Sequence, residues 1–464
     1  MVKNPNAWDS YDKASIASIY EHSLKLKNRS LSEVVELPEG ITNTRDRGNL
    51  GSLVEIYYFR HKAPNDHNPD FVEAGLELKT TGVVKHKSGA YRAKERLVLG
   101  LIDFNKIVTE NWDTSTFLHK CQIMLILFSK FDKEIPVIHR KFVMDPLLYS
   151  INDPDGGSHS ISGFENIPAS ELEMIKKDWL AIQAKVISGK AHELSEGDTI
   201  YLGACRKGAG GENEALRTQP NSDTKAKARA LSFKQGYLNK LIARHEGQVH
   251  ELGLFKELPF DEAALRTFKP YIGKSIEELG IEFNFLKKSK NQKGYHRELA
   301  LKILKSSGSS LTELQNADIE LKTIRLTNRA QPREAMSFPA FDYMKILNEE
   351  WEDSKFFEKI ERKFLFIIFK ENNEGVESLL GTEFWNMPYE DRLEARRVWE
   401  DTKRRVAVDA SDLPKSSESC VAHVRPKAAD ANDTAMTPQG QMLVKKCFWL
   451  NKDYIAGIVA KNIN

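Results

Sequence analysis

The sequence has few cysteines, no long apolar run and almost no net charge. Its four cysteines, Cys121, Cys205, Cys420 and Cys447, lie far apart and form no CxxC pair. This spacing argues against a zinc ribbon or a disulfide framework and suits a reducing cytosol. No apolar run approaches the ~18 residues of a membrane span, and the start, MVKNPNAWDSYDKAS, lacks the apolar core of a signal peptide. We therefore expect a cytoplasmic protein that does not associate with a membrane.

The charges nearly cancel, because 68 Lys and Arg face 66 Asp and Glu, a formal net charge of +2. Such a balance is not typical of a protein that coats nucleic acid by bulk attraction, although it leaves room for a local basic groove. The sequence also has no P-loop, no GxGxxG after a strand and no HExxH. The glycine-rich stretch GAGGENEA (208–215) lacks the Lys-Ser/Thr of a P-loop, so we predict a loop there.

What the chain does have is enough apolar residues, 41%, for well-formed cores, and a length of 464 residues that suggests two or three domains. Its two halves also resemble each other. Residues 94–107 align without a gap with residues 333–346, and the same offset pairs Trp112, Ser115, Phe117 and Lys120 with Trp351, Ser354, Phe356 and Lys359. An apolar strand follows in each half, IMLILF (123–128) and FLFIIF (364–369).

Matches in the same order predict a duplication. We expect one mixed α/β (α+β) fold used twice, with domains at 1–245 and 266–464 and a linker at 246–265.

Two carboxylates and a lysine are predicted to converge in the first half. On a strand, side chains two residues apart share a face, so Glu77 and Lys79 project together. Asp70 precedes a predicted turn at Ala74-Gly75 that can fold it back towards Glu77. This trio suits phosphodiester hydrolysis, because carboxylates hold Mg²⁺, the metal activates a water, and the lysine orients that water and offsets developing charge. The alternative is a solvated strand face, since charges alternating on a strand are common.

Glu55 is a further candidate. It ends the run RGNLGSLVE (47–55) on an apolar helical face that is predicted to be buried. A buried carboxylate needs a partner, and a metal would serve. A salt bridge or an exposed helix position is the alternative.

These segments resemble the MutH-like endonucleases, a branch of the PD-(D/E)xK nuclease superfamily that includes mismatch-repair nicking enzymes and type II restriction enzymes cutting at GATC. The resemblance runs through RGNLGSLVE (47–55), D-x6-ELKT (70–80), His119-Lys120, AHELSEGDTIYLGACRKGAG (191–210), LRTQP (216–220) and AKARALSFKQGYL (226–238). It implies two tandem MutH-like nuclease folds, of which the first cuts and the second binds a further site without catalysis.

Carried over to these positions, the resemblance assigns Glu55, Asp70 and Glu77 to the metal and makes Lys79 the catalytic lysine. Lys120 is similar to the second active-site lysine of the family, with a surface lysine as the alternative.

The resemblance also implies DNA contacts. Arg47-Gly48 is similar to the family's basic-glycine step at the minor groove. Arg206 and Lys207 fall in a loop similar to the one that reads guanine in the major groove. Arg217 and Tyr237 are further implied contacts, with a buried core position as the alternative for Tyr237.

The second half departs from the pattern. Leu301 stands where Glu55 is expected and Glu313 where Asp70 is, whereas Glu320 and Lys322 persist. The reading loop is retained as Arg425-Pro426-Lys427, with Arg425 and Lys427 as DNA contacts. A copy that keeps its reading loop and loses catalytic residues indicates a regulatory DNA-binding domain.

We therefore predict a Mg²⁺-dependent type II restriction endonuclease that cuts double-stranded DNA at 5′-GATC-3′ and leaves 5′-phosphates. One active site per chain implies dimerisation on DNA, and self-protection implies a cognate DNA methyltransferase. A mismatch-repair-type nicking enzyme and a sequence-specific DNA-binding protein that does not cleave remain alternatives.

Overall fold

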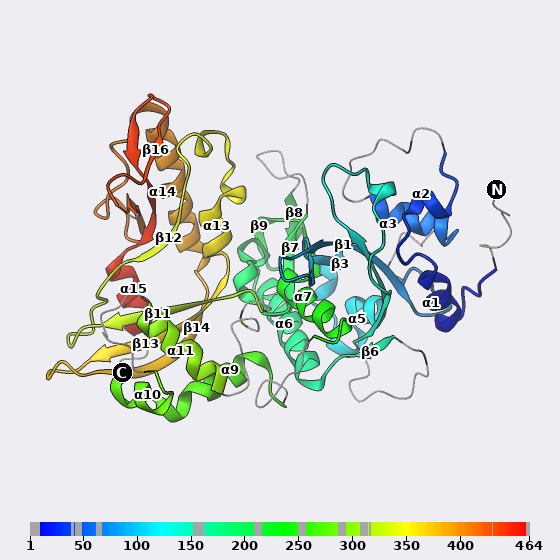
Figure 1. Ribbon diagram of the computed structural model, residues 1–464, viewed down its shortest axis with the longest axis horizontal. Coiled ribbons are helices and arrows are strands. Elements are labelled where there is room, and N and C mark those ends of the chain that lie inside the picture. The colour runs from blue at the N-terminus through cyan, green and yellow to red at the C-terminus, as the bar shows by residue number, and fades with distance from the viewer. Residues whose placement is uncertain are drawn as a thin grey trace. The chain divides into compact units, whose positions relative to one another are not determined.

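The computed structural model describes residues 10–38, 41, 49–61, 67–151, 161, 163–207, 216–248, 257–285, 294–306, 314, 317–428 and 430–460. The fold is mixed α/β, as predicted (Figure 1). The chain forms two compact units. The first comprises residues 1–192, 200–206 and 217–251, and the second comprises residues 193–199, 207–216 and 252–464. No helix in the described part of the chain is long and apolar enough to cross a membrane.

The main sheet of the first unit has the strand order β2-β1-β4-β5-β6. Its strands are β1 (Glu77–Lys85), β2 (Tyr91–Ala93), β4 (Ile123–Lys130), β5 (Leu147–Ser150) and β6 (Phe164–Asn166). β1 and β4 are parallel, in the register that pairs Glu77 with Met124. The apolar run of β4 is buried, which fits a strand at the centre of a sheet.

Short helical segments precede β1 in the sequence: α1 (Ile16–Leu24), α2 (Leu31–Val34), α3 (Asn49–Leu53) and the π-helical turn η3 (Val54–Tyr58). Leu50 and Val54 pack in one core with Leu76, which directly precedes β1, and with Leu78 of β1. Because side chains alternate along a strand, burying Leu78 in this core turns Glu77 and Lys79 towards the opposite face of the sheet.

A second, antiparallel sheet in this unit has the order β3-β10-β7, with β3 (Leu97–Leu101), β10 (Arg229–Phe233) and β7 (Leu202–Arg206). β7 is therefore an edge strand. The hairpin β8 (Leu216–Gln219) and β9 (Ser222–Lys227) precedes β10, and its turn uses Asn221 at φ 59°, a conformation that asparagine tolerates. The longer helices are α6 (Ala169–Ile187) and α7 (Gln235–His245). Between β3 and β4 lie α4 (Phe104–Ile107), η4 (Trp112–Thr114) and α5 (Thr116–Cys121). The short turns η5 (Val137–His139) and η6 (Ala191–Glu193) also precede β7. The turn η7 (Glu196–Asp198) belongs to the second unit.

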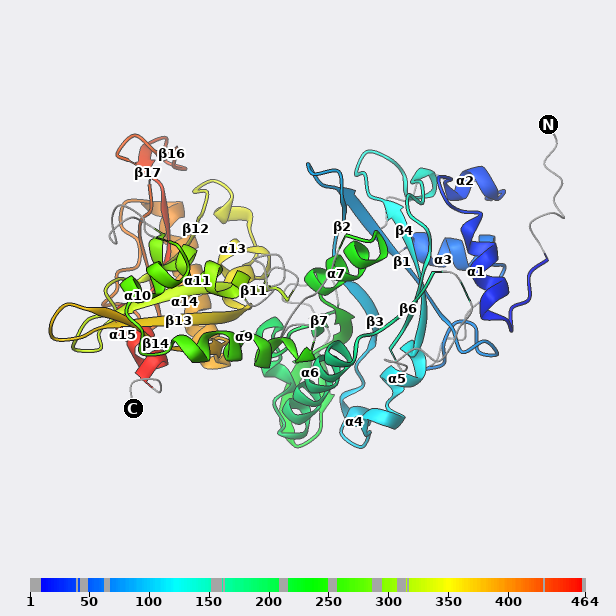
Figure 2. The same cartoon turned by 60° about the horizontal axis from the view of Figure 1, so that its bottom comes forward.

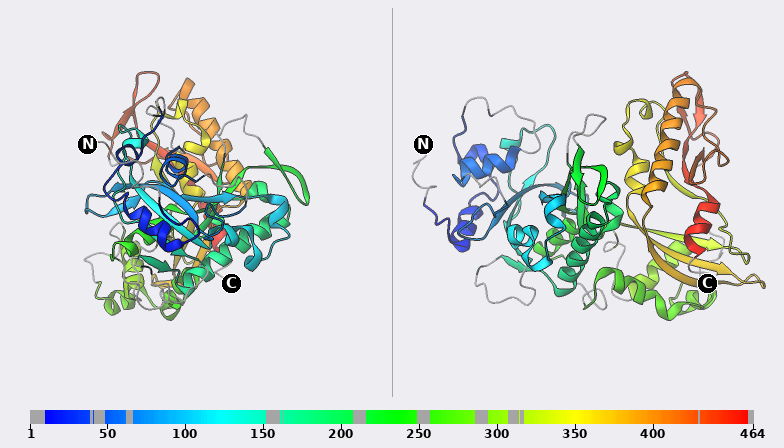
Figure 3. Two further views of the ribbon diagram at one scale, coloured as in Figure 1. Left: turned by 90° about the vertical axis from the view of Figure 1, so that its right-hand side faces the viewer. Right: turned by 180° about the vertical axis from the view of Figure 1, so that it is seen from behind.

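The second unit contains sheets ordered β11-β13-β14 and β12-β18-β15 and the hairpin β16-β17. The strands are β11 (Ile319–Leu326), β12 (Met336–Ala340), β13 (Lys363–Glu371), β14 (Glu377–Trp385), β15 (Ala422–Pro426), β16 (Thr434–Met436), β17 (Met442–Val444) and β18 (Lys446–Leu450). Helices α9 (Phe260–Phe268), α10 (Ile276–Glu282) and α11 (Tyr295–Ser306) lie along the first of these sheets (Figure 2). The long helix α14 (Tyr389–Val408) packs against β15 (Figure 3). The other helices and turns are η8 (Lys269–Tyr271), η9 (Ile346–Asn348), η10 (Trp351–Asp353), α13 (Lys355–Ile360) and α15 (Lys452–Val459).

The two units repeat one fold down to individual hydrogen bonds. Ser115 Oγ accepts the N–H of Leu118 at 3.1 Å and donates to the carbonyl of Trp112 at 2.8 Å. In the second unit Ser354 accepts from Phe357 at 3.1 Å and donates to Trp351 at 2.7 Å. Each serine thereby caps a short helix that ends at the central strand. The parallel pair β1–β4 corresponds to β11–β13, and the sheet β3-β10-β7 corresponds to β12-β18-β15. The predicted tandem fold is confirmed.

The predicted loop at 208–215 lies outside the described residues.

Candidate active site

A tight turn before β1 brings the first carboxylate to the second. Phe71 and Leu76 exchange backbone hydrogen bonds of 2.9 and 3.1 Å, and Gly75 lies within the turn at φ 64°, where a side chain would be strained. The backbone N–H of Asp70 then donates to Oε2 of Glu77 at 3.0 Å. In return, the N–H of Leu78 donates to Oδ2 of Asp70 at 2.9 Å. The predicted fold-back of Asp70 towards Glu77 is thus present.

Two lysines complete the cluster. Lys79 Nζ lies 2.7 Å from Oε1 of Glu77 and donates to the carbonyl of Leu99 at 3.3 Å. Lys120, on α5, lies 3.4 Å from Oε2 of the same glutamate and donates to the carbonyl of Asn68 at 2.9 Å. Glu77 is 1% exposed, so the alternative of a solvated strand face does not hold. The structure brings together Asp70, Glu77, Lys79 and Lys120, and their catalytic roles stay predictions.

Burial sets the electrostatics of this cluster. It raises the pKa of Asp70, a shift that the charge of Glu55 adds to and that Lys79 and Lys120 partly offset. Burial likewise raises the pKa of Glu77, opposed by Lys79 and reinforced by Asp70. For Lys79, burial lowers the pKa, but the negative charges of Glu77 and Asp70 outweigh it and the net direction is upward. Both lysines are therefore held in a pocket whose carboxylates favour additional positive charge.

The donor set fits a hard divalent cation of the Mg²⁺ type. Among the described residues, no three His, Cys, Asp or Glu side chains lie close enough to hold a metal ion. Glu55 is half-buried on η3 and influences Asp70 by its charge, but it does not join Asp70 and Glu77 in such a group. Oδ1 of Asp70 accepts no hydrogen bond from the described residues. Mg²⁺ commonly uses one or two protein carboxylates and fills its other positions with waters and substrate phosphate, so Asp70 and Glu77 suffice chemically.

The residues predicted to read DNA in the first half of the sequence lie around β7. Arg206 ends this strand and Lys207 follows it, both half-buried. Arg217 is exposed on β8 of the neighbouring hairpin. Arg47 and Gly48 lie outside the described residues.

Tyr237 corrects the sequence-based expectation. It lies on α7 rather than on a strand, and it is fully buried. Its hydroxyl donates to Glu171 at 2.8 Å and lies 2.7 Å from the hydroxyl of Tyr149, and its ring stacks on Tyr201 at 4.5 Å. The phenol is thus fully satisfied inside the protein. The structure favours the core alternative, and a contact between Tyr237 and DNA stays a prediction.

Two partners of the lysines were missed by the sequence-based prediction. Lys79 is held by the backbone carbonyl of Leu99 and Lys120 by that of Asn68. The side chain of Asn68 also lies 3.1 Å from His119. A backbone carbonyl has no residue-type signature, so only the polar run His67-Asn68 before Pro69-Asp70 could have hinted at the second contact.

The equivalent glutamate of the second unit has a pKa shifted in the opposite direction to that of Glu77. Glu320 lies 3.5 Å from Lys322 and 3.7 Å from Lys359. Burial raises the pKa of Glu320, but these lysines and Arg362 outweigh it and the net direction is downward. The pKa of Lys322 is lowered, first by burial and then by the nearby lysines. Arg362 itself pairs with Glu358 at 2.7 Å and lies 4.0 Å from Asp318. The two lysines beside Glu320 disfavour a metal ion at this carboxylate.

The other predicted differences of the second unit are only partly visible. Leu301 lies half-buried on α11, and Glu313 lies outside the described residues. Arg425 is exposed on β15, and its guanidinium lies 4.5 Å from the ring centre of Trp449. Lys427 is tied to the carbonyl of Phe338 at 2.7 Å.

Comparisons with known proteins agree with this geometry. The family profile of the DNA mismatch repair enzyme MutH matches residues 59–157 and 304–393, one segment in each half. The type II restriction enzyme Sau3AI of Staphylococcus aureus is 31% identical over 481 aligned residues, covering 91% of this chain and 94% of that enzyme. The DNA mismatch repair protein MutH of Shewanella woodyi is 27% identical over 204 residues, covering 44% of this chain and 79% of that protein.

The duplicated fold and the lysine–carboxylate cluster, with these matches, define a site-specific deoxyribonuclease. The chain belongs to the MutH-like type II restriction endonucleases.

Proposed function

We propose that the first unit hydrolyses DNA phosphodiester bonds at 5′-GATC-3′ in a Mg²⁺-dependent reaction. The observation that carries this proposal is the cluster in which the buried Glu77 contacts both Lys79 and Lys120 while Asp70 folds back onto it. The GATC site comes from the resemblance to MutH-like endonucleases.

In the proposed mechanism Asp70 and Glu77 would hold the metal, with Glu55 as a further ligand if DNA binding draws it in. Bound there, Mg²⁺ would supply a polarised phosphate and a water of lowered pKa. Lys79, held by the Leu99 carbonyl, orients the attacking water and stabilises the negative charge that develops on the phosphate. Lys120, held by the Asn68 carbonyl, binds a phosphate oxygen beside it.

Base recognition would come from Arg206 and Lys207, which can donate to the O6 and N7 acceptors of guanine. Arg217 on the adjacent hairpin would contact the phosphate backbone, and Arg47-Gly48 would approach the minor groove. Near-neutral charge over the whole chain is compatible with such local contacts.

The second unit would bind a further GATC as an effector without cutting it. Its support is the cation-rich cluster around Glu320 and the exposed Arg425 of the retained reading loop. With one cutting site per chain, a double-strand break requires two chains meeting on DNA. A cognate DNA methyltransferase would protect the host genome.

The direct test incubates a supercoiled plasmid containing GATC with wild-type protein and Mg²⁺. We expect linear DNA with 5′-phosphates at GATC, and no product from Lys79→Ala. If wild type and Lys79→Ala leave the plasmid equally intact with every divalent metal, the chain is a binding protein and the proposal fails.

The effector role has its own experiment. Cleavage of one-site and two-site plasmids is compared for wild type and Arg425→Ala. We expect the two-site plasmid to be cut faster by wild type only. Equal rates in all four combinations would remove the effector role.

A nicking enzyme of the mismatch-repair type is the alternative, supported by the match to the Shewanella protein over 79% of its length. Mapping the ends on both strands separates the two, because a nicking enzyme leaves one strand of each site intact.

A further inference from the structure

The strand that leads to Arg206 begins at a buried carboxylate. Asp178, on α6, is 3% exposed. Its carboxylate accepts the backbone N–H groups of three consecutive residues, Ile200 at 2.8 Å, Tyr201 at 2.6 Å and Leu202 at 2.9 Å. β7 starts at the last of these residues and ends at Arg206.

This anchor matters because β7 is the edge strand of its sheet. From Leu202 to Arg206 it pairs with β10 on one side. An edge strand has half the inter-strand hydrogen bonds of a central strand, so its position along the sheet depends more on contacts at its ends. At the N-terminal end, Asp178 fixes three amides of the backbone to the helix. At the C-terminal end, the chain continues directly into Lys207.

A carboxylate suits this task better than any neutral side chain of its size. Two oxygens accept three N–H groups, whereas the NH₂ of an asparagine would face donors. Burial raises the pKa of Asp178 to about 6, a shift that Lys234 and the three amides only partly offset. A buried carboxylate needs hydrogen-bond donors, and the three amides at the start of β7 supply them.

The second unit holds its reading strand by different chemistry. The sequences of α6 and α14 align without a gap. Pro168 and Trp179 match Pro388 and Trp399, so Val398 occupies the position equivalent to Asp178. The amides at the start of β15 instead bond to a nearby hydroxyl. Val421 and Ala422 donate to Ser419 Oγ at 3.2 and 3.4 Å.

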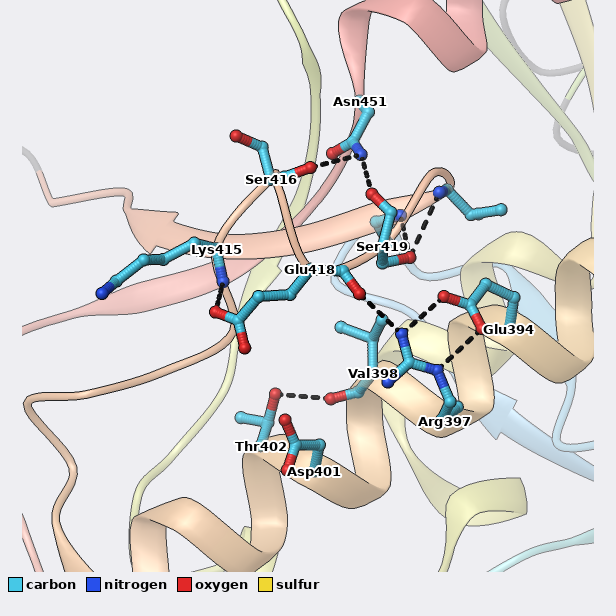
Figure 4. Close-up of polar contacts among 12 residues, drawn as sticks. Glu394, Arg397, Val398, Asp401, Thr402, Lys415, Ser416, Glu418, Ser419 and Asn451 are labelled. Carbon is cyan, nitrogen blue, oxygen red and sulfur yellow. Dashed lines mark hydrogen bonds and ion pairs between the residues drawn. The ribbon is translucent and has the colours of Figure 1, made fainter.

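The loop that carries Ser419 is held by hydrogen bonds from two side chains outside the loop. Asn451 Nδ2 donates to the carbonyl of Ser419 at 2.6 Å, and Arg397 on α14 donates to the carbonyl of Glu418 at 2.9 Å while pairing with Glu394 (Figure 4). The side chain of Arg397 is 54% exposed, so this anchor is hydrated. In each unit a side chain of the long helix hydrogen-bonds to the backbone at or before the start of the reading strand. Only in the first unit is this side chain a buried carboxylate, Asp178.

We propose that Asp178 is a positioning residue for base recognition, which fixes the edge strand β7 so that Arg206 and Lys207 meet the bases in register. This inference rests on the proposed function, because it assigns those two residues to the DNA.

The test measures cleavage of GATC DNA and of DNAs with one base pair of the site changed, for wild type, Asp178→Asn and Asp178→Val. Asp178→Asn keeps the volume and one acceptor oxygen, and Asp178→Val introduces the residue type of the second unit. Glu173→Gln is the matched control, since it makes the same carboxylate-to-amide change on the same helix with a side chain 58% exposed.

We expect Asp178→Asn to raise KM and to lower the preference for GATC over the changed sites, each by about tenfold, the loss of one good base contact. The single-turnover rate at saturating DNA should stay within about twofold, because no group at the reacting phosphate is altered. Asp178→Val should shift the same two quantities further, and Glu173→Gln neither.

A purely structural role predicts a different pattern, in which a smaller active fraction lowers all rates together and leaves KM and the preference unchanged. That pattern in folded Asp178→Asn overturns the proposal, as does failure of both variants to fold, which would assign Asp178 to stability. Wild type that does not cut GATC DNA defeats the proposed function itself. If the wild type prefers GATC DNA and the Asp178 variants keep the same KM and the same preference, only this inference fails.

Discussion

Lys120 Nζ lies 3.4 Å from Oε2 of Glu77, a separation that places a second ammonium at a carboxylate already paired with Lys79. The 18% exposure of the Lys120 side chain leaves room for a phosphate oxygen. We expect Lys120→Ala to lower the cleavage rate at saturating DNA by about 100-fold, as for loss of one preorganised donor to a transition state. Lys120→Arg should recover little, because a planar guanidinium does not replace a compact ammonium. Lys133→Ala, at a side chain 82% exposed, is the control, and equal rates for it and Lys120→Ala would contradict the assignment.

Asp70 is expected to matter chiefly for the metal. Asp70→Asn keeps an acceptor for the N–H of Leu78 but removes one of two charges available to a cation. The Mg²⁺ concentration for half-maximal cleavage should rise by on the order of 100-fold, because a hard cation binds a neutral amide oxygen poorly. Cleavage rates against MgCl₂, and calorimetric titration of the DNA-free protein with Mn²⁺, give two independent readings. Chelation with EDTA should abolish wild-type cleavage reversibly. An unchanged metal dependence in the variant would exclude Asp70 as a ligand.

The buried position of Tyr237 leads to a test that separates stability from binding. Tyr237→Phe removes the hydroxyl that bonds to Glu171 and Tyr149. The free energy of unfolding should fall by about 1–2 kcal/mol, the usual cost of leaving a buried polar partner unpaired. DNA affinity, measured by fluorescence anisotropy, should stay the same. Arg217→Ala, at an exposed position of β8, should weaken DNA binding and leave the free energy of unfolding unchanged. Weaker DNA binding by a stable Tyr237→Phe protein would restore the original expectation.

A buried carboxylate in the second unit is expected to make stability depend on pH. Glu377 is 7% exposed, 2.9 Å from His296 and 2.8 Å from Arg325. Burial raises its pKa, but bonds from His296 and Arg325 outweigh this and hold it at about 2, below the ordinary 4.5. Because the folded pKa is the lower one, the contribution is complete above about pH 4.5 and is lost as the pH falls towards 2. It amounts to about 3 kcal/mol at most.

Denaturant unfolding of wild type and Glu377→Gln between pH 3 and 7 checks this. The difference in unfolding free energy should be constant above pH 5 and shrink below pH 4.5. A difference that grows as the pH falls would show that the sign is wrong.

Much of the architecture could be predicted because the repeated residues each perform a visible local task. Ser115 and Ser354 cap equivalent helices, and the apolar runs that follow can only be central strands. The spacing of Glu77 and Lys79 predicted their shared face, and Gly75 marked the turn that returns Asp70.

The remaining contacts depend on groups that the sequence does not distinguish. Lys79 and Lys120 are held by backbone carbonyls, and Asp178 by backbone amides, which every residue type offers. Tyr237 was misplaced because a tyrosine is equally suited to a core or a surface, and the register of α7 against Glu171 is set by tertiary packing.

The pKa of Glu320 is lowered whereas that of Glu77 is raised, a difference that bears on two proposed properties of the second unit. Lys322 and Lys359 lie 3.5 and 3.7 Å from the carboxylate of Glu320, and such positive charge disfavours a divalent cation and attracts a phosphate. If the second unit binds DNA without cutting it, as we propose, the lysines beside Glu320 would contribute to both properties, by disfavouring a metal ion and by attracting the DNA backbone.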